Sequence, residues 1–315
     1  MPPLALLAAC MLDLLLGDPE WFPHPVVLMG RLIVILEKAA RKLTRPGWGH
    51  RIAGGGIVLI VVVFSFETTF FVVKAASVLH PWFGSLLSVF LAWTTLAART
   101  LHREAAKVEK ALREEDLEKA RRELSGIVGR DTSVLSREGI IRAAVETVAE
   151  NSSDGVIAPL FYLILGGAPL AMAYKAVNTL DSMLGYKDEA CRDLGFFPAR
   201  FDDLVNFIPA RVTGLLLVVV SFLWKGSGRD AFRILRRDGR KHSSPNAGIP
   251  EAAAAGALGI QLGGRNFYGG VMIEKPVIGE PVRPLTPGAV RGAVQLMYGA
   301  FFLMAMAGVL ALMLR

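Results

Sequence analysis

The chain has 315 residues, of which 53% are hydrophobic and 20% are charged, and its formal net charge is +7. A disordered chain would be far more polar, and a soluble domain of this size would not be so apolar on average. The two cysteines, Cys10 and Cys191, exclude a disulfide framework, a four-cysteine zinc site and a cysteine-ligated iron–sulfur cluster. Several apolar stretches reach the roughly 20 residues that a helix needs to cross a bilayer, so the composition indicates a polytopic membrane protein.

Six apolar runs follow one another along the chain. The first, Leu4–Gly17, is short, and no basic residue precedes it, so we interpret it as a retained helix rather than a signal peptide. The next two are so close together that they predict a helical hairpin. We predict an all-α fold with about five membrane-embedded helices, no β-domain and a single membrane-embedded domain over residues 1–315. The five longer runs are Ile52–Val73, Ser77–Ala98, Val156–Val177, Phe207–Trp224 and Ala289–Leu314.

Three polar connections are rich in lysine and arginine. They are Glu37–Arg51, Arg99–Arg142 and Lys225–Lys241, and the positive-inside rule places all three on the cytoplasmic side. The positive charge of the chain therefore indicates orientation in a membrane, and we expect no nucleic-acid partner. The second connection has apolar residues at spacings of three and four, which predicts a charged cytoplasmic helical segment at about residues 99–142.

The segment Asn178–Asn206 presents a conflict of sidedness. Two complete crossings, by Val156–Val177 and Phe207–Trp224, would place it outside, and its six acids against three lysines and arginines are tolerated there. However, the first of these runs contains four helix-disturbing residues, so we expect it to be broken or re-entrant. These residues are Pro159, Gly166, Gly167 and Pro169.

The first candidate cluster for chemistry lies before the third long apolar run. Arg142, Glu146, Glu150 and Asp154 recur every four residues and would share one face of a helix, which we expect to end at Asn151–Gly155. Two interpretations remain open: a solvated face with ion pairs, or carboxylates that bind a divalent metal or a cationic group.

A second cluster, Lys175, Asn178, Asp181 and Ser182, has spacings of three and four at the end of an apolar run. An ionisable residue inside a membrane usually faces a partner or a water-filled cavity, and here Asp181 or Glu150 could pair with Lys175. Alternatively, the lysine extends to the membrane surface.

The third cluster, Arg200, Asp202, Asp203 and Asn206, precedes the fourth long run. Carboxylates of this kind suit Mg²⁺, which binds one or two of them together with phosphate oxygens. A helix N-cap is the structural alternative.

Two loops have the composition of phosphate-binding turns. The segment Lys241–Glu251 contains two prolines and a glycine before a helix that we expect over Glu251–Leu262, and Gly263–Gly270 predicts a second glycine-rich turn. Neither loop matches a Walker A or Rossmann pattern, and generic loops of this composition are common.

Several strings together, in this order, resemble the adenosylcobinamide-phosphate synthase family, the CobD/CbiB cobalamin-biosynthesis membrane proteins. They are LDLLLGDPEWFPHPVVLMGRLI, VGRDTSVLSREGIIRAAVETVAENSSDGVIAPLFY, AYKAVNTLDSMLGYKDEACRDLGFFPARFDDLVNFIPAR and KHSSPNAGIPEAAAAGALGIQLGG, followed by YGG. The resemblance covers most of the chain and is weakest in the two early spans and the charged helix around Ala105–Leu124.

The resemblance implies a carbon–nitrogen ligase that uses ATP and Mg²⁺. Such proteins join adenosylcobyric acid to (R)-1-amino-2-propanol O-phosphate, or to ethanolamine phosphate, and release adenosylcobinamide phosphate. ATP and the corrinoid precursor are cytoplasmic, so we expect a multi-pass protein of the cytoplasmic membrane with its active site facing the cytoplasm. We predict that four segments converge on one cytoplasm-facing cavity: Glu150–Asp154, Lys175–Asp181, Asp202–Asp203 and Ser244–Glu251. A homo-oligomer, or association with other cobalamin-assembly membrane enzymes, stays open. Without the resemblance, the competing interpretation is a membrane transporter or binding protein for an anionic small molecule.

The candidate residues fit this chemistry in kind, although which acid binds metal and which acts as a base stays open. We expect the catalytic residues to be Glu150, Asp154, Lys175 and Asp181. The expected metal ligands are Glu146, Asp202 and Asp203. The expected substrate- and phosphate-binding residues are Asn151, Asn178, Lys241, His242, Ser244, Asn246, Glu251, Gly263, Gly264 and Tyr268.

Overall fold

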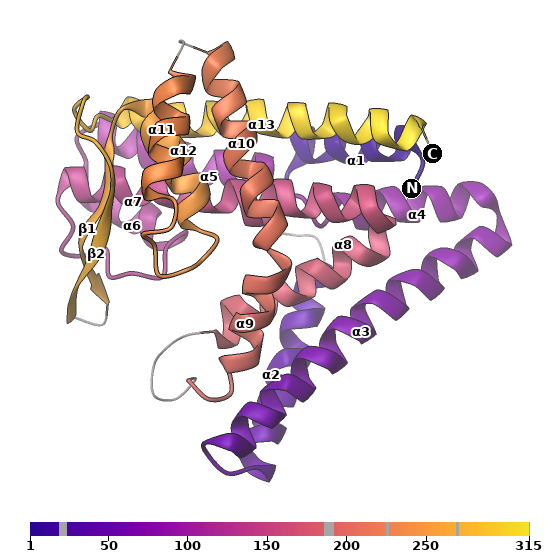
Figure 1. Ribbon diagram of the computed structural model, residues 1–315. Helices are drawn as coiled ribbons and strands as arrows, with labels where there is room; N and C mark the ends of the chain where they lie inside the picture. The colour runs from indigo at the N-terminus through magenta and orange to yellow at the C-terminus, as the bar shows by residue number, and fades with distance from the viewer. Residues whose placement is uncertain (19–23, 186–191, 225–226, 269–270, 315) are drawn as a thin grey trace. The chain divides into compact units, whose positions relative to one another are not determined.

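The computed structural model describes residues 1–18, 24–185, 192–224, 227–268 and 271–314, which are mainly helical (Figure 1). They divide into two compact units. The first unit consists of residues 1–97, 158–206 and 305–315, and the second of residues 98–157 and 207–304. Both units therefore combine segments that are far apart in the sequence.

The first unit is built around one long helix, α3 (Trp48–Leu79), which packs against four other helices. The expected hairpin is present: α3 and α4 (Pro81–Trp93) pack together and meet at His80, whose Nδ1 accepts a hydrogen bond from the backbone N–H of Trp82 at 3.2 Å. The first apolar run also forms a helix, as expected. The remaining helices of this unit are α1 (Pro3–Leu16), α2 (Pro25–Leu43), α8 (Ala158–Leu184) and α9 (Phe196–Val205).

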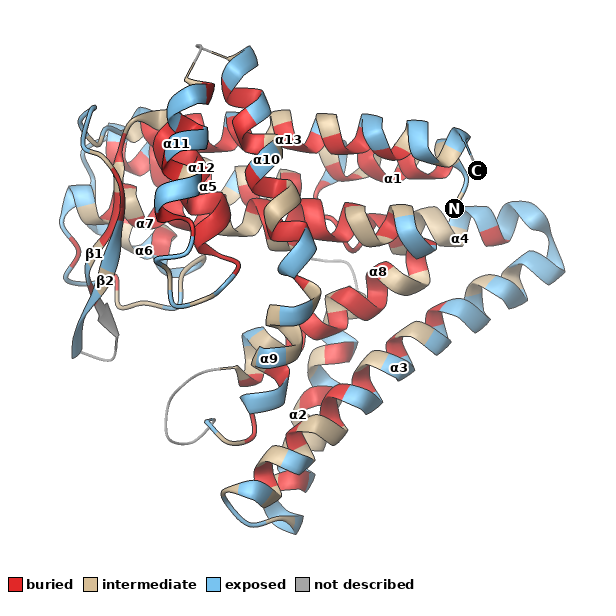
Figure 2. Ribbon diagram, viewed as in Figure 1, coloured by how far each residue is buried: buried red, intermediate tan, exposed pale blue. Residues whose placement is uncertain are grey.

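Much of α3 is exposed, as Figure 2 shows, and many of the exposed side chains are large and apolar. Phe64, Phe70 and Phe71 are among its exposed side chains, and such a surface suits contact with lipid. By length and composition, four described helical stretches could cross a membrane, and a fifth is added if α9 and α10 (Phe207–Leu223) together make one broken span. The prediction of a polytopic α-helical membrane protein with about five embedded helices is confirmed. The four stretches are Trp48–Leu79, Pro81–Arg113, Arg137–Leu184 and Pro287–Met313.

Helix α8 is interrupted near its first third. Gly167 has φ 69° and ψ −161°, which is not a helical conformation, and Pro169 follows it inside the helix. A proline lacks the N–H of the helical ladder and crowds the carbonyl four residues earlier, while glycine alone tolerates the positive φ without strain. The expectation that this apolar run is broken is confirmed.

The expected helix end at Asn151–Gly155 is wrong. Helix α7 (Arg137–Asn151) continues through a π-helical turn, η1 (Ser152–Ile157), directly into α8. The polar side chains bond back to the preceding turn: Ser152 Oγ donates to the Val148 carbonyl at 2.6 Å, and Asn151 Nδ2 donates to the Thr147 carbonyl at 2.9 Å. Serine and asparagine can end a helix through local hydrogen bonds, but here those bonds stay within it.

The second unit packs its helices around α12 (Gly248–Leu258), which is buried over almost its whole length (Figure 2). Alanines and glycines make up most of this helix, so its neighbours approach closely; a Cβ on Gly256 would lie only 2.7 Å from the Ala231 Cα. Helix α12 contacts α7, α10 and α11. The other helices that contribute to this unit are α5 (Ala98–Arg113), α6 (Leu117–Ser125), α10 (Phe207–Leu223), α11 (Gly228–Asp238) and α13 (Pro287–Met313).

The helix expected over Glu251–Leu262 begins earlier and ends earlier. It starts at Gly248 and stops at Leu258, because Gly259 adopts a left-handed conformation with φ 67° and ends the helix. The helical character of the charged segment at about residues 99–142 is confirmed, although Glu115, with φ 60°, separates α5 from α6.

The glycine-rich turn expected at Gly263–Gly270 is instead largely a strand. Strand β1 (Gln261–Tyr268) pairs antiparallel with β2 (Val271–Gly279), with Gln261 opposite Gly279. A bulge interrupts the pairing between Leu262 and Gly264, and glycines inside a strand commonly mark a bulge. This hairpin is the only sheet among the described residues, and the expected all-α class holds apart from it.

Candidate functional site

A buried ion pair lies at the centre of the second unit. Arg130 Nη2 and Glu146 Oε2 are 2.6 Å apart, and their side chains are only 8% and 3% exposed. Glu146 comes from α7, whereas Arg130 comes from the loop that precedes it. The other amino group of the guanidinium donates to the side-chain carbonyl of Asn266 on β1, so the pair joins the loop, the helix and the hairpin.

The backbone of the hairpin bulge forms a hydrogen bond with the second carboxylate oxygen of Glu146. The backbone N–H of Gly263 donates to Glu146 Oε1 at 2.8 Å, and its carbonyl accepts from Arg142 Nη1 at 2.8 Å. Gly263 has φ 79°, and a Cβ on it would lie 2.1 Å from the Pro276 carbonyl oxygen. Only glycine fits this position, so its backbone groups can reach α7.

Glu251 forms the acidic side of this centre. It lies in the first turn of α12 and is buried. Burial raises the pKa of its carboxyl well above the usual value, and the negative charges of Glu146 and Glu150 raise it further, while Lys275 and Arg130 oppose them. Two carboxylates of α7 therefore act on the buried carboxyl of Glu251, and two cations, buried Arg130 and half-buried Lys275, oppose them.

The loop before α12 is held by its own polar side chains. Ser244 Oγ accepts hydrogen bonds from the backbone N–H groups of Asn246 and Ala247, at 3.2 and 3.3 Å. His242 Nδ1 accepts from the Ser244 N–H at 3.0 Å, and Arg211 Nη1 donates to Asn246 Oδ1 at 3.0 Å. The sequence-predicted residues of this loop thus lie together at the amino end of α12, where they shape a turn.

Lys241 pairs with a buried carboxylate. Its Nζ lies 2.7 Å from Asp238 Oδ1, and Asp238 also accepts hydrogen bonds from Arg237 and from the Gly279 N–H. Burial would raise the pKa of Asp238, but these hydrogen bonds outweigh it and hold the pKa well below the usual range. The hydrogen bond from the Gly279 N–H to Asp238 joins the end of α11 to the end of β2.

The other candidates belong to the first unit. Lys175, Asn178 and Asp181 lie on α8 at spacings of three, so they share one partly exposed face. Asp202 and Asp203 lie on α9, which packs against α8. One hydrogen-bonded chain joins the two helices, because Tyr174 donates to Asn206 Oδ1 at 2.9 Å and Asn206 Nδ2 donates to Asp202 at 3.0 Å.

The structure thus groups the predicted residues into two sets, one in each unit. The set in the second unit contains Glu146, Glu150, Asn151, Asp154, Lys241, His242, Ser244, Asn246, Glu251, Gly263 and Gly264. Tyr268 ends β1, but its side chain lies outside the described part of the chain. The convergence of both sets on one cytoplasm-facing cavity stays a prediction. Within the described ranges, no group of three or more histidine, cysteine, aspartate or glutamate side chains is arranged to hold a metal ion by itself.

Sequence reasoning missed four basic or amide residues of the second set. Arg130, Asn266 and Lys275 belong to the buried centre, and Arg211 holds the loop before α12. Arg130 and Arg211 each lie within a string that carries the family resemblance, which was the one available signal for them. Asn266 and Lys275 lie outside those strings, and neither has a spacing relation to its partners.

Comparison with known proteins gives a consistent result. The chain matches the CobD/Cbib protein family over residues 6–297. It is 56% identical to the cobalamin biosynthesis protein CobD of Geobacter metallireducens over 294 residues, which cover 93% of this chain and 92% of the relative. It is 50% identical to the cobalamin biosynthesis protein CbiB of Salmonella arizonae, with 94% and 93% covered, and 48% identical to CobD of Clostridium acetobutylicum, with 94% of each covered. No solved structure matches the chain.

Proposed function

Because the chain belongs to the CobD/CbiB family of cobalamin-biosynthesis proteins, we propose that it is the ligase that attaches the amino-alcohol phosphate to the corrin ring. In this proposal the protein forms an amide between adenosylcobyric acid and an amino-alcohol phosphate, and the reaction consumes ATP. The amino-alcohol phosphate is (R)-1-amino-2-propanol O-phosphate or ethanolamine phosphate. The products are adenosylcobinamide phosphate, ADP and phosphate. The protein works in the cytoplasmic membrane with its site facing the cytoplasm, where ATP is present.

One observation carries the proposal: the buried centre that combines three carboxylates with Arg130 and Lys275. Burial raises the pKa of Glu251 there, and the negative charges of Glu146 and Glu150 raise it further. Amide synthesis from an acid and an amine needs this combination, because phosphate oxygens require cations and an ammonium group requires a base.

The reaction needs two steps, since a carboxylate is a poor acyl donor. The propionate oxygen of the corrin attacks the γ-phosphate of ATP, which forms an acyl phosphate and releases ADP. The amine then attacks the acyl carbon, the carbon–oxygen bond to phosphate breaks, and phosphate leaves. The amine can attack only after its ammonium form has lost a proton. We assign the proton to the ionised form of Glu251, because a carboxylate with a raised pKa is a stronger base than an ordinary one once it has released its own proton.

Mg²⁺ would supply charge neutralisation for the phosphates. The proposed ligands are Asp202, Asp203 and Glu146, and their oxygen donors fit this ion in kind. Both oxygens of Glu146 accept hydrogen bonds, from Arg130 and from the Gly263 N–H, so metal binding there would require it to release one of them. Asp202 and Asp203 are therefore the stronger pair of candidates.

The remaining residues have proposed roles in binding. Glu150 and Asp154 lie on the α7–η1 segment beside the buried centre, and Lys175 and Asp181 lie on α8. We propose that these four contact the reacting groups. The loop Lys241–Ala247 and the Gly263–Gly264 bulge are proposed to bind phosphate oxygens.

The test is product analysis by mass spectrometry. Full-length protein purified in detergent receives adenosylcobyric acid, Mg²⁺, ATP and each amino-alcohol phosphate in turn. The wild type should form the amide only with ATP, and Glu150→Gln, Asp154→Asn, Lys175→Met and Asp181→Asn should abolish it. Glu104→Gln, an exposed change on α5, should leave turnover unchanged. Full activity in several of the four variants would show that the clusters are structural.

A transporter is the second candidate, and the break of α8 at Gly167 favours it. Interrupted helices mark the binding sites of many transporters. Reconstituted vesicles distinguish the two functions: ATP-independent accumulation of the corrinoid without amide formation would support transport and contradict the ligase.

A further inference from the structure

A polar cavity lies at the carboxyl end of α12, whereas the proposed catalytic carboxylate Glu251 lies near its amino end. The cavity has a volume of about 440 Å³ and belongs entirely to the second unit. Glu251 and Leu258 are seven residues apart, about 10 Å along the helix, and Glu251, Glu146 and Arg130 do not line the cavity, so it is distinct from the buried centre. Three arginines line it: Arg113, Arg283 and Arg291.

Two of these arginines are held by one buried carboxylate. Glu109 Oε1 lies 2.8 Å from Arg113 Nε and 3.1 Å from Arg291 Nη2, and the Glu109 side chain is largely buried while both arginines are exposed. The carboxylate thus orients two guanidinium groups at the cavity. Three guanidinium charges against one carboxylate leave a formal charge of +2 there.

The backbone of Arg283 is fixed by a hydrogen bond, whereas its side chain has no polar partner among the described residues. Its N–H donates to the Gly259 carbonyl at 2.7 Å, and a Cβ on Gly259 would lie 3.5 Å from Arg283 Cγ. The guanidinium forms no hydrogen bond or ion pair with any residue that the structure describes.

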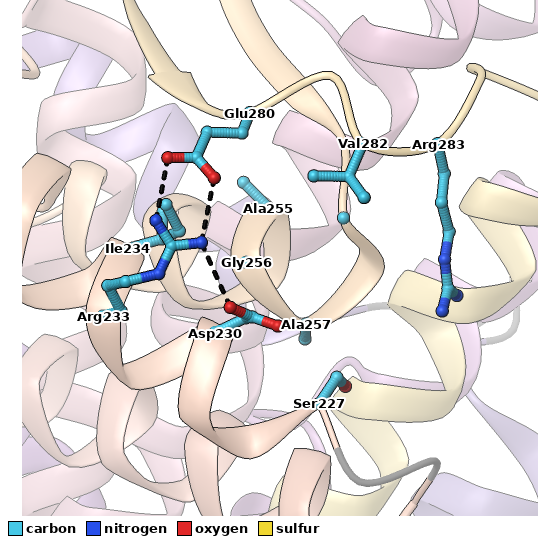
Figure 3. A pocket seen from close by; sticks show the side chains of 11 residues that line it. Ser227, Asp230, Arg233, Ile234, Ala255, Gly256, Ala257, Glu280, Val282 and Arg283 are labelled. Atoms are coloured by element: carbon cyan, nitrogen blue, oxygen red, sulfur yellow. Dashed lines mark hydrogen bonds and ion pairs between the residues drawn. The ribbon is translucent and has the colours of Figure 1, made fainter.

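The neighbouring cavity in Figure 3, which also includes Arg283, provides a contrast. Its other arginine, Arg233, is bound by both oxygens of Glu280, at 2.8 and 2.9 Å, and by Asp230 at 3.1 Å. Arg233 and Arg237 together lower the pKa of Glu280 to about 2. The charge of Arg233 is therefore compensated within the protein, whereas Figure 3 shows no such partner for Arg283.

The remaining wall of the 440 Å³ cavity is apolar. Trp224 presents an aromatic ring, and Leu258, Ile260 and Pro284 add aliphatic surface. Guanidinium groups suit phosphate oxygens, which they bind through paired hydrogen bonds, and the ring and aliphatic groups suit an organic substituent.

We propose that this cavity binds the phosphate group of an organic phosphate, with Arg283 as its principal ligand and Arg113 and Arg291 beside it. A nucleotide and an anionic phospholipid both have this chemistry, a phosphate joined to a flat or aliphatic part. The inference does not depend on the ligase reaction, because the cavity uses none of the residues assigned to it.

Direct binding to the full-length protein tests the proposal. The probes are a non-hydrolysable ATP analogue, measured by calorimetry in detergent, and nanodiscs of phosphatidylcholine with or without phosphatidic acid. Arg283→Gln is the informative variant, since its side chain has no partner to lose and the fold should be retained. Arg236→Gln is the matched control, because Arg236 is an exposed arginine of α11 that lines neither cavity.

The expected result is binding of one of the two probes, with a dissociation constant raised roughly tenfold or more by Arg283→Gln and changed less than twofold by Arg236→Gln. Arg283→Lys should recover part of the affinity, because it keeps the charge but not the paired hydrogen bonds. The probe whose affinity falls in Arg283→Gln but not in Arg236→Gln identifies the source of the phosphate, whereas ATP-analogue binding that Arg283→Gln leaves unchanged belongs to the ligase site. Equal affinities for Arg283→Gln and Arg236→Gln, or no binding of either probe to the wild type, would overturn the proposal.

Discussion

Glu146 and Arg130 are almost completely removed from solvent, so each charge depends on the other for its stability. Moving a charged group out of water costs several kcal/mol, and the ion pair with its extra hydrogen bonds offsets that cost. Asn266 bonds the arginine, and the Gly263 N–H bonds the carboxylate. The pair is therefore part of a network that also defines where the hairpin lies against α7.

Removing one partner should destabilise the protein strongly. Arg130→Met leaves the Glu146 carboxylate buried without its counter-charge, and we expect a loss of about 3–5 kcal/mol in the free energy of unfolding. Thermal unfolding in detergent, followed by tryptophan fluorescence, measures the effect. The double variant Arg130→Met with Glu146→Gln should be more stable than Arg130→Met alone, because no unpaired charge remains.

An exposed pair provides the control for this experiment. Glu104 and Lys107 are also close, at 2.7 Å, but both are partly in solvent, and Glu104→Gln should change the unfolding free energy by less than about 1 kcal/mol. Similar losses in Glu104→Gln and Arg130→Met would contradict the importance of burial.

Glu251 should make stability depend on pH. Its pKa in the folded protein is raised above the ordinary value of 4.5, so the folded state keeps a proton that the unfolded chain has already released. Stability therefore falls as the pH rises from about 4.5 through the pKa of the folded state. The melting temperature of Glu251→Gln should lack this decrease, and wild-type and variant curves that stay parallel from pH 4 to pH 8 would refute the assignment.

At the scale of elements, the hairpin depends on glycine at its bulge. Gly263 combines a φ of 79° with close contact to the Pro276 carbonyl, and its N–H and carbonyl both bond α7. A bulge bends a strand and redirects its backbone groups, which is what allows this strand to bond a helix.

Gly263→Ala should therefore destabilise the protein and reduce amide formation together. The added Cβ would lie 2.1 Å from a carbonyl oxygen, so the strand must move away from Glu146. Gly56→Ala is the matched control: Gly56 lies inside helix α3, and nothing lies within 4 Å of an added Cβ. Its melting temperature should equal or slightly exceed that of the wild type. Unfolding curves of both variants make the comparison, and equal effects would contradict a steric role for Gly263.

The sequence predicted correctly those helices and helix breaks that depend on residues close together in the chain. The long apolar runs became helices, and Gly167 and Pro169 broke α8, because length, hydropathy and backbone restrictions act within a few residues. The hairpin was missed since β1 is stabilised by pairing with β2 and by α7, and its glycines resemble a turn.

In the candidate site, too, the sequence predicted what neighbouring residues determine and missed what tertiary contacts determine. The spacing of Glu146 and Glu150 placed them on one helix face, whereas Arg130 and Lys275 reach the buried centre only through tertiary contacts. Nothing in the spacing of the sequence indicates those contacts.

At the scale of the whole molecule, the chain alternates between two units, and each unit holds part of the proposed chemistry. A common cytoplasmic cavity requires that the segments after α8 and before α12 face the same side of the membrane. The basic segment Lys225–Lys241 supports a cytoplasmic position for the second of these.

Thiol labelling on intact cells tests this topology. Single cysteines replace Lys187, which lies outside the described residues, and Lys241, in a background lacking Cys10 and Cys191. A membrane-impermeant reagent should label neither position in intact cells and both after permeabilisation. Labelling at position 187 from outside would exclude the shared cavity.

The contact between Glu146 and the Gly263 N–H also has a consequence for biogenesis, because 117 residues separate its two members. At translation rates of about 5–20 residues per second, α7 leaves the ribosome roughly 6–23 seconds before the strand that completes its bonding. Arg130 is made 16 residues ahead of Glu146, so the ion pair can form early and compensate the carboxylate during that interval. A nascent chain without this arginine would keep the Glu146 carboxylate uncompensated during that interval, so the Arg130→Met variant should accumulate in the membrane at a lower level than the wild type.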